Sequence, residues 1–502
     1  MVFRGTLILC MFLLSNFASA EDLDQQVDAL IQPLASALSA FVFYPVDLLG
    51  QPFPLIVMWL GVAAVFFTLY MGFINIRGFG LALRHIRGHF HNPSARGEIS
   101  HFQAVATAIS GTVGVGNIGG VAVAIVIGGP GAAFWLFIAG FLAMSTKLVE
   151  CTLGVKYRRH NDDGSVSGGP MYYLEHYMVV RGLPRLGKLL GGFYALSLVI
   201  GCLGIGNMFQ SNQAYVQFVT ITGGEASFFA DKGWLFGLLI AATVGVVIIG
   251  GIRSIARVAG YVVPFMALLY TFSALLIIAM SYEQVPAALY LIVSSAFNME
   301  SATGGMIGAI IVGFQRALFS NEAGLGSASI AHSAVKTHEP ASEGLVSLLE
   351  PFIDTVVICS LTSLVIVTTA YPNGLMDDGL EGIALTSAAF AHHISWAPYP
   401  LALAALLFAF STSIAWSYYG LKGWTYLFGE APLVQILFKL IFCSFIALGC
   451  MVQLSAVLEF SDAMVFLIAI PNLLGLYLFA PEVKRDVNDY LRRIRAGQVH
   501  LA

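Results

Sequence analysis

A glycine-rich stretch within an apolar segment is the part of the sequence whose residue types best suit ion binding. Residues 110–120 read SGTVGVGNIGG and lie inside an apolar run from Phe102 to Ile127. Glycine lets a backbone leave helical geometry, and non-helical backbone at membrane depth persists only where it lines a cavity or is buried in protein. The stretch therefore predicts a helix broken into two halves, whose free N–H groups and carbonyls offer one place for an anion and another for a cation. The alternative is that these glycines only allow close packing between membrane helices.

The composition indicates a protein that crosses the membrane several times. The 502 residues are 58% hydrophobic and 10% charged, with a mean hydropathy of +0.82, which excludes an ordinary soluble protein. The net charge is −4, and no run of Lys and Arg is interleaved with aromatic residues, so we expect no nucleic-acid partner. The six cysteines show neither CxxC nor Cys/His metal spacing and are interpreted as packing residues. No feature of the sequence calls for an obligatory protein partner.

The N-terminal residues 1–20 are typical of a secretory signal peptide. Arg4 precedes an apolar core, Thr6–Leu14, and Ala18-Ser19-Ala20 follows as a cleavage site. Residues 21–52 then carry apolar side chains at helical spacing, which predicts an amphipathic segment on the periplasmic face.

Eleven membrane spans are predicted after this segment, and the loop charges orient them. With the N-terminus outside, nearly every loop Lys and Arg falls on the inner side, and only Lys232 falls outside. The first span and a basic cytoplasmic loop occupy residues 53–102, and residues 483–502 form a basic cytoplasmic tail. The spans are 53–75, 103–127, 131–157, 188–218, 234–251, 256–282, 285–315, 344–371, 397–428, 432–455 and 460–482.

Without the first span, the remaining ten divide into two halves, 103–282 and 285–482. Because five is odd, the halves have opposite orientations, as in the inverted repeats of many secondary transporters. The first helix of the second half should then also be broken, and residues 295–305, SAFNMESATGG, carry Asn298, Glu300 and two glycines. The predicted fold is an all-α polytopic membrane protein with a 5+5 inverted repeat, broken first and sixth core helices, and one extra N-terminal span.

Seven motifs follow one another along the chain: Gly114–Gly120, Gly128–Trp135, Lys147 with Glu150, Gly168–Tyr172, Gly206–Gln210, Phe319–Ser327 and Trp416–Gly420. Together they resemble the motifs of the alanine or glycine:cation symporter family, and the resemblance covers essentially the whole chain after about residue 45. Two departures occur: Val115 stands where the family usually has Thr, and Phe134-Trp-Leu-Phe137 replaces Phe-Trp-Met-Trp. The resemblance implies sodium-coupled uptake of small neutral amino acids across the bacterial inner membrane, on the fold of the bacterial leucine transporter.

The resemblance implies an amino-acid site around the first broken helix. A substrate carboxylate would meet the amides of Gly116 and Asn117, beside Val115, and the ammonium would meet carbonyls near Thr112 and Phe297. Asn207 and Gln210 lie three residues apart on the third core helix and so face the same way. Gln210 is the main predicted polar contact with the substrate and Asn207 is a second one, although both residues also suit interhelical hydrogen bonds. Phe297 and Trp416 are predicted to cap the pocket and restrict it to small side chains.

A sodium site is implied where the first and eighth core helices meet. A hard cation prefers oxygen ligands, and the aligned pattern suggests the carbonyls of Ser110, Val113 and Ala409 with the hydroxyls of Thr412 and Ser413. The alternative is that the two hydroxyls bond the carbonyl one turn back. Sodium is thus the expected coupling ion, and no organic cofactor is expected.

Ionisable residues within spans are costly and need a reason. Lys147 and Glu150 are predicted to pair with one another, and Glu350 with Asp354 leaves proton coupling open as an alternative. Glu300, in the predicted second break, could approach the ammonium group of the substrate. The polar loop 320–327 lacks the Gly-Lys-Ser/Thr ending of a phosphate loop and is interpreted as an inner gate or hinge.

Two further classes of function remain as rivals. A cation channel is disfavoured because no fourfold filter sequence is visible. An enzyme is disfavoured because no nucleophile–base pair or metal cluster stands out.

Overall fold

The computed structural model describes residues 32–33, 35–48, 51–90, 95–161, 164–298, 305–376, 379–380, 382–452 and 454–499. The predicted signal peptide 1–20 and Glu300 lie outside these residues. Of the predicted amphipathic segment 21–52, residues 35–42 are helical. Its end instead forms one strand and part of the next of an antiparallel hairpin, β1 (Pro45–Leu48) and β2 (Gln51–Pro54). The three prolines at positions 45, 52 and 54 explain this difference, since proline disfavours a helix interior.

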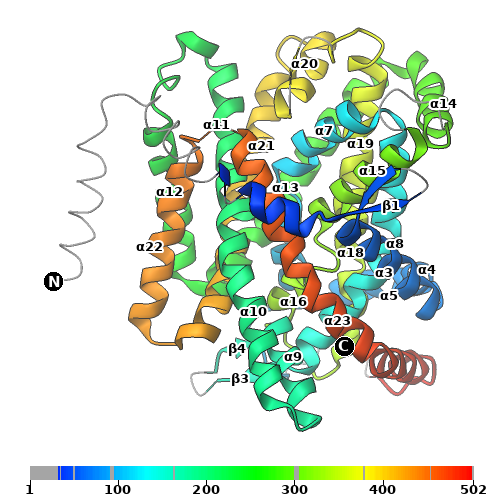
Figure 1. The fold of residues 1–502 in the computed structure, drawn as a ribbon, viewed down its shortest axis with the longest axis vertical. Helices are drawn as coiled ribbons and strands as arrows, with labels where there is room; N and C mark the ends of the chain where they lie inside the picture. Colours follow the sequence, from blue (N-terminus) through cyan, green and yellow to red (C-terminus); the bar gives the residue numbers. More distant parts are fainter. Residues whose placement is uncertain are drawn as a thin grey trace.

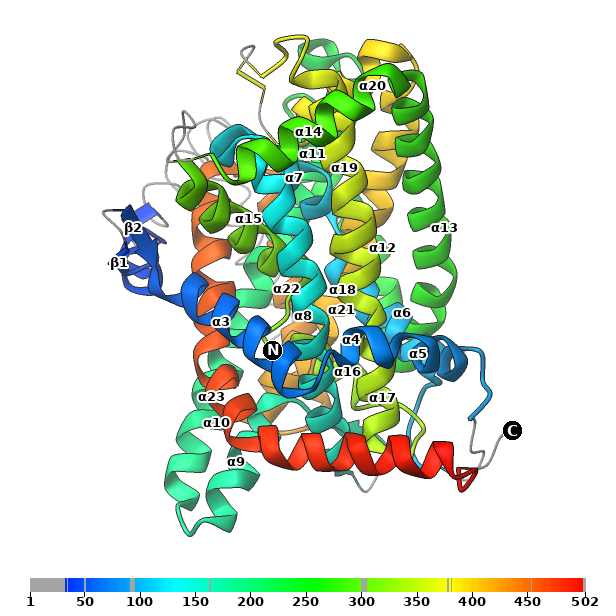
Figure 2. The same ribbon diagram turned by 90° about the vertical axis from the view of Figure 1, so that its right-hand side faces the viewer.

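The described chain forms an elongated helical bundle, seen from two sides in Figures 1 and 2. Seven of its described helices are long and apolar enough to cross a membrane. A bent pair supplies an eighth span, and α3 (Leu55–Tyr70) and α12 (Gly233–Ile249) are shorter apolar helices. These elements match ten of the eleven predicted spans. The seven are α8 (Gly131–Lys156), Pro184–Ile221, α13 (Gly251–Met280), Pro340–Ala370, α21 (Pro398–Phe428), α22 (Pro432–Gly449) and Asp462–Arg495.

Several of these spans are built from shorter elements. The span Pro184–Ile221 joins α10 (Pro184–Leu203) to α11 (Phe209–Ile221) through η2, a π-helical turn at Gly204–Met208. The last span is part of α23 (Leu454–Arg495). The span Pro340–Ala370 contains α17 (Pro340–Ser347), α18 (Leu349–Pro351), η5 (Phe352–Cys359), α19 (Ser360–Val365) and η6 (Ile366–Ala370).

Short elements connect the spans at both ends of the bundle. In Figure 2, α9 and the end of α23 lie at the lower end, whereas α14 and α20 lie at the upper end. The connecting elements are α4 (Ile74–Arg77), α5 (Phe79–Ile86), β3 (Arg159–His160), β4 (Val166–Ser167), α9 (Pro170–Val180), η3 (Gly224–Ala226), η4 (Tyr282–Gln284) and α20 (Ile383–His393).

The first core helix is broken as predicted. It consists of α6 (His101–Thr112) and α7 (Gly119–Gly128), which are bent by 61° relative to one another. A single 3-10 turn, η1 (Val115–Asn117), lies between them. At the start of α6, the side chain of Ser100 accepts a hydrogen bond from the amide of Gln103 and forms a capping box, which fixes where the helix begins.

The sequence predicted that the second broken helix is interrupted at residues 295–305. In the structure, the interruption that approaches the first break lies elsewhere. That stretch instead connects α14 (Val285–Ala296) to α15 (Gly305–Asn321), and residues 299–304 lie outside the described part. Helix α15 ends at Asn321, and α16 (Ser327–His332) begins after five non-helical residues. These five residues are buried, so the loop interpreted as an inner gate is the broken part of the sixth core helix.

The outer surface of the bundle suits a lipid environment. Helix α13 exposes four large apolar side chains, Tyr261, Phe265, Leu268 and Phe272, each at least 56% accessible. They recur every three or four residues and so form one stripe along the helix. Because an apolar stripe this large is unfavourable in water, this face is expected to contact lipid.

Candidate functional site between two broken helices

The break between α6 and α7 forms a backbone cradle closed by one side chain of the long third core span. The side-chain oxygen of Gln210 accepts a hydrogen bond from the amide of Val115 at 2.9 Å. The side-chain nitrogen of Gln210 donates to the carbonyl of Ile205, in the π-helical turn, at 3.0 Å. Gln210 therefore contacts the break itself, and its contact with a substrate stays a prediction.

The two amides predicted to meet a carboxylate differ from one another. The amide of Asn117 already donates to the Gly114 carbonyl at 3.1 Å. The amide of Gly116 has no acceptor among the described residues. A Cβ added to Gly116 would meet only the ring of Phe319, at 3.6 Å, which is an ordinary contact, so no side chain crowds the backbone on that side.

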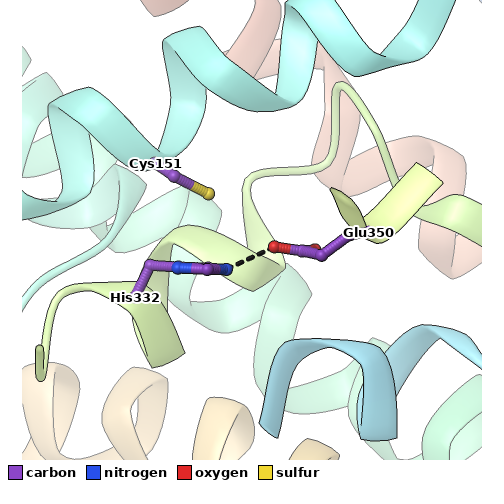
Figure 3. Close-up of side chains that lie close together, drawn as sticks. All are labelled: Cys151, His332 and Glu350. Atoms are coloured by element: carbon purple, nitrogen blue, oxygen red, sulfur yellow. Dashed lines mark hydrogen bonds and ion pairs between the residues drawn. The ribbon is translucent and has the colours of Figure 1, made fainter. Parts of the chain in front are cut away.

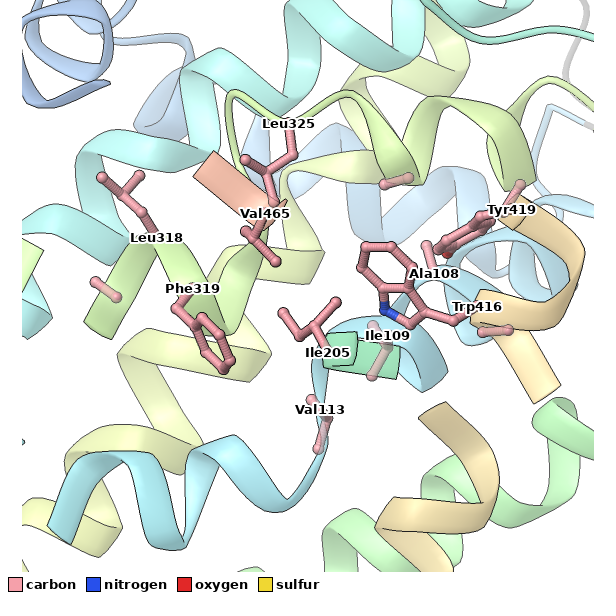
Figure 4. Close-up of a cluster of buried hydrophobic side chains, with 14 of the residues drawn as sticks. Ala108, Ile109, Val113, Ile205, Leu318, Phe319, Leu325, Trp416, Tyr419 and Val465 are labelled. Atoms are coloured by element: carbon pink, nitrogen blue, oxygen red, sulfur yellow. The ribbon is translucent and has the colours of Figure 1, made fainter. Parts of the chain in front are cut away.

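Apolar side chains from four elements surround the cradle. Figure 4 shows Ile205 between Phe319 of α15 and Trp416 of α21, with Val113 of the break beside it. All four are buried. The ring of Phe319 also meets Phe209 edge-to-face, with 5.8 Å between the ring centroids. The sequence placed Phe319 within a family motif but gave it no role, because its motif was assigned to the inner loop.

Trp416 links the two breaks. Its indole nitrogen is 3.3 Å from the carbonyl of Gly111, near the end of α6, and 2.9 Å from a carboxylate oxygen of Glu322 in the second break. Glu322 has a φ of 57°, a left-handed conformation that is rare for a side chain other than glycine or asparagine. The predicted position of Trp416 beside the site is therefore supported by geometry, and Glu322 is a polar neighbour that the sequence did not single out.

Two predicted substrate contacts lie away from the cradle. The side-chain amide of Asn207 donates to the carbonyl of Phe442 in α22 at 2.7 Å, which is the interhelical alternative. Phe297 follows α14, is 53% exposed, and packs against Phe134 and Trp135. Its assignment as a pocket cap was wrong because the break of the sixth core helix lies further along the chain. Thr112 is buried at the end of α6, and its hydroxyl is 3.4 Å from the carbonyl of Ile109.

The residues predicted to bind sodium lie where α6 meets the middle of α21, and sodium binding by them stays a prediction. The hydroxyl of Thr412 lies 3.5 Å from the carbonyl of Val113. The Ser110 hydroxyl donates to the carbonyl of Ser411 at 2.5 Å. The Ser413 hydroxyl donates to the carbonyl of Ala409 at 2.8 Å, which is the one-turn-back alternative. Thr412 thus faces the break, whereas Ser413 would have to turn its hydroxyl to join a cation.

The second break is held by Glu150 of α8. One carboxylate oxygen of Glu150 accepts the amides of Gly324 at 2.7 Å and Gly326 at 3.1 Å, together with the side-chain amide of Asn472 at 2.9 Å. Both glycines have positive φ, 94° and 81°, so the turn needs residues without a Cβ. The predicted pair of Lys147 with Glu150 is not formed, because Glu150 binds the second break.

Lys147 belongs instead to a buried polar cluster below the break. Its ammonium nitrogen is 3.6 Å from a carboxylate oxygen of Glu350. The other oxygen of Glu350 binds His332 of α16, whose second ring nitrogen is 2.6 Å from Glu343. Figure 3 shows the contact between His332 and Glu350, with Cys151 of α8 beside it. The potential ligand atoms of Cys151, His332 and Glu350 lie within 4.8 Å of one another, a grouping that sequence spacing did not reveal.

Fold and site together define a helical membrane transporter with a buried cradle between two broken helices. A solved structure with a similar fold is that of MhsT in complex with L-phenylalanine, with a TM-score of 0.54. The two chains are 14% identical, and the match covers 78% of this chain and 98% of MhsT. At this level of identity the likeness concerns the fold alone.

Comparison of the sequence with known families gives the family directly. The model of the sodium:alanine symporter family matches residues 37–501, and the chain belongs to this family. The sodium/alanine symporter AgcS of Methanococcus maripaludis is 39% identical, over 91% of this chain and 96% of AgcS. The probable sodium/glutamine symporter GlnT of Bacillus subtilis is 33% identical, over 86% of this chain and 87% of GlnT. The chain is therefore a transporter of a sodium-coupled amino-acid symporter family and not an enzyme.

Proposed function

We propose that this protein couples the inward movement of sodium to uptake of alanine, glycine or a similar small neutral amino acid. The observation that carries the proposal is the first break at Gly116, whose amide is left without an acceptor among the described residues, beside the buried ring of Phe319. A carboxylate fits this amide because the first turn of a helix presents unsatisfied N–H groups and a positive end.

The relatives point to the same class of substrate without deciding between its members. One relative is described as a sodium/alanine symporter and another as a probable sodium/glutamine symporter. Val115 and the buried rings of Phe319 and Trp416 leave an apolar surround, which favours a substrate with a short apolar side chain.

The proposed orientation follows from charge. Arg and Lys residues gather in the loops at one side of the membrane, so the C-terminal tail lies in the cytoplasm and the N-terminus outside. The membrane is proposed to be the inner membrane of a bacterium. Inward sodium movement then runs down both its concentration gradient and the membrane potential.

The proposal is tested with purified protein in proteoliposomes. Uptake of labelled alanine, glycine, serine and glutamine is measured with sodium and proton gradients imposed separately. Saturable uptake of a small amino acid that requires a sodium gradient is expected. Uptake driven by protons and indifferent to sodium would favour the proton-coupled alternative, and a non-saturating sodium current without amino acid would favour a channel.

A further inference from the structure

We propose that the groove between α3 and α15 binds one phospholipid with an anionic headgroup, whose acyl chain lies in the groove and whose phosphate lies against Lys484. The groove has a volume of about 350 Å³, and the described residues that line it are all apolar or glycine. Its walls include Val62 and Val65 of α3 and Ile310 and Phe314 of α15. The two valines are 57% and 42% exposed, so the groove opens on the outer surface of the bundle.

The inner wall of the groove is held in place from behind. A Cβ on Gly61 of α3 would lie 3.2 Å from the ring of Phe314, which is closer than an ordinary contact. The other neighbour of this buried ring is Trp135 of α8, with 6.4 Å between the ring centroids. The glycine lets the two helices approach and leaves the ring as a fixed apolar surface. Such a surface suits a hydrocarbon chain, which gains from contact along its whole length.

Aromatic side chains continue the groove to one end of α3, where a cation lies. Phe66 lines the groove, and its ring stacks on that of Tyr70, one turn further along, with 5.2 Å between the centroids. The ammonium of Lys484 lies 4.2 Å from the centre of the Tyr70 ring. Tyrosine is common at the level of the lipid headgroups. Apolar groove, tyrosine and ammonium therefore follow one another in the order of a phospholipid's chain, glycerol region and phosphate.

The length of this arrangement suits a chain from one leaflet. If Tyr70 marks the level of the headgroups, α3 rises about 14 Å from Tyr70 back to Gly61. One leaflet has about half of the hydrocarbon thickness, or about 15 Å. An acyl chain that begins beside Tyr70 therefore reaches Gly61, within the groove, without leaving its own leaflet.

The charge of Lys484 has no acidic partner among the described residues. Helix α23 contains Pro481, and its last part turns across the lower end of the bundle in Figure 2. Glu482 and Asp486 both bind Lys156, at 2.5 Å. Because each lies two residues from Lys484, the two acids face away from it. The ammonium therefore remains available to a phosphate at the membrane surface.

The chain that leaves the same end of α3 adds positive charge without any acid. Residues 72–90 contain Arg77, Arg84 and Arg87 and neither Asp nor Glu. All three arginines are exposed, and Arg77 donates to the carbonyl of Met71, the residue after α3, at 3.0 Å. Each basic residue near a membrane surface raises the affinity for anionic lipid about fivefold. The charge favours an anionic phospholipid over a neutral one, in the cytoplasmic leaflet for the proposed orientation.

The headgroup is tested by native mass spectrometry of delipidated protein titrated with dioleoyl phosphatidylglycerol or dioleoyl phosphatidylcholine. The wild type is expected to bind one phosphatidylglycerol at least tenfold more tightly than phosphatidylcholine. Lys484→Gln is expected to reduce this preference about fivefold. Lys188→Gln is the matched control, since it removes an exposed lysine of α10, and it should keep the preference. Equal affinity for the two lipids in the wild type, or an unchanged preference in Lys484→Gln, would overturn the proposal.

The groove is tested with a variant that fills it. Val65→Trp should fold because Val65 is 42% exposed, and it is expected to weaken phosphatidylglycerol binding several-fold. Val246→Trp is the control, because Val246 is 74% exposed on α12, away from the groove, and it should bind like the wild type. Unchanged binding in Val65→Trp, or equal weakening in both variants, would remove the chain from the groove.

A short-chain lipid separates the headgroup from the chain. Dihexanoyl phosphatidylglycerol has the same headgroup but chains of six carbons, and it is expected to displace the dioleoyl lipid at least tenfold less well. Equal displacement would show that only the headgroup is bound, which would overturn the proposal. None of these measurements involves transport, so their outcome is independent of the proposed function.

Discussion

At the scale of single residues, the hydroxyl of Thr412 separates the sodium assignment from its alternative. Thr412 faces the Val113 carbonyl of the break, whereas Ser413 bonds the carbonyl one turn back in its own helix. Thr412→Ala is therefore expected to raise the sodium concentration for half-maximal uptake about tenfold, the equivalent of about 1.4 kcal/mol. The measurement is the sodium dependence of labelled amino-acid uptake. Ser417→Ala, on the same helix with its hydroxyl on the Ile414 carbonyl, should leave it unchanged. Equal sodium dependence in both variants would remove Thr412 from the ion site.

Gly116 offers a residue-scale test of the substrate cradle. A methyl group at this position would lie 3.6 Å from the Phe319 ring, an ordinary contact, so Gly116→Ala should fold normally. The methyl would, however, occupy the space in which a carboxylate approaches the Gly116 amide. We expect at least a tenfold higher KM for the amino acid at an unchanged melting temperature.

The matched control for this variant is Gly120→Ala. A Cβ at Gly120, in α7, would meet no atom within 4 Å, so this variant should transport like the wild type. An unchanged KM for Gly116→Ala would move the substrate carboxylate elsewhere.

At the scale of elements, the sequence predicted most helices and the first break but misplaced the second. Residues 295–305 and 320–327 both combine glycines with polar side chains in an apolar segment, and composition does not distinguish them. What distinguishes them is packing. The second stretch forms hydrogen bonds with Trp416 and Glu150, which are far away in the chain. The predicted substrate contact of Asn207 was misplaced for a similar reason. Helical spacing shows on which face of its helix a residue lies, but not which helix packs against that face.

The π-helical turn in the third core span makes room for the tryptophan that links the two breaks. A Cβ on Gly206 would lie 2.1 Å from Cγ of Trp416, and the indole has no space to retreat because it is fully buried. Gly206→Ala is therefore expected to destabilise the protein by about 1–3 kcal/mol, as overpacked cores usually are. Thermal unfolding in detergent measures this effect.

The same span supplies the control for Gly206. A Cβ on Gly192, in α10, would meet nothing within 4 Å, and alanine is the better helix former there. Gly192→Ala should be at least as stable as the wild type. If Gly206→Ala unfolded at the same temperature as Gly192→Ala, the indole would not be fixed against this turn.

At the scale of the whole molecule, the chain extends beyond the fold that it shares with a solved structure. The likeness to MhsT covers nearly all of that chain but only 78% of this one. The family match supports a sodium-coupled symporter, and the membrane potential then acts on each transported charge. One charge moved across 100 mV provides about 2.3 kcal/mol, enough for roughly 50-fold accumulation.

The proposed orientation of the chain can be tested at the two ends of the longest apolar span. The span Pro184–Ile221 has 38 residues and rises about 55 Å, more than the hydrocarbon core of about 30 Å. Exposed Arg181 precedes it and exposed Glu225 follows it, so the two residues lie on opposite sides of the membrane. Because basic loops remain in the cytoplasm, Glu225→Cys should react with an impermeant maleimide in intact cells, and Arg181→Cys only after permeabilisation. Replacing Cys10 and the half-buried Cys443 lowers the background, since the other four cysteines are buried. The reverse labelling pattern would invert the proposed topology.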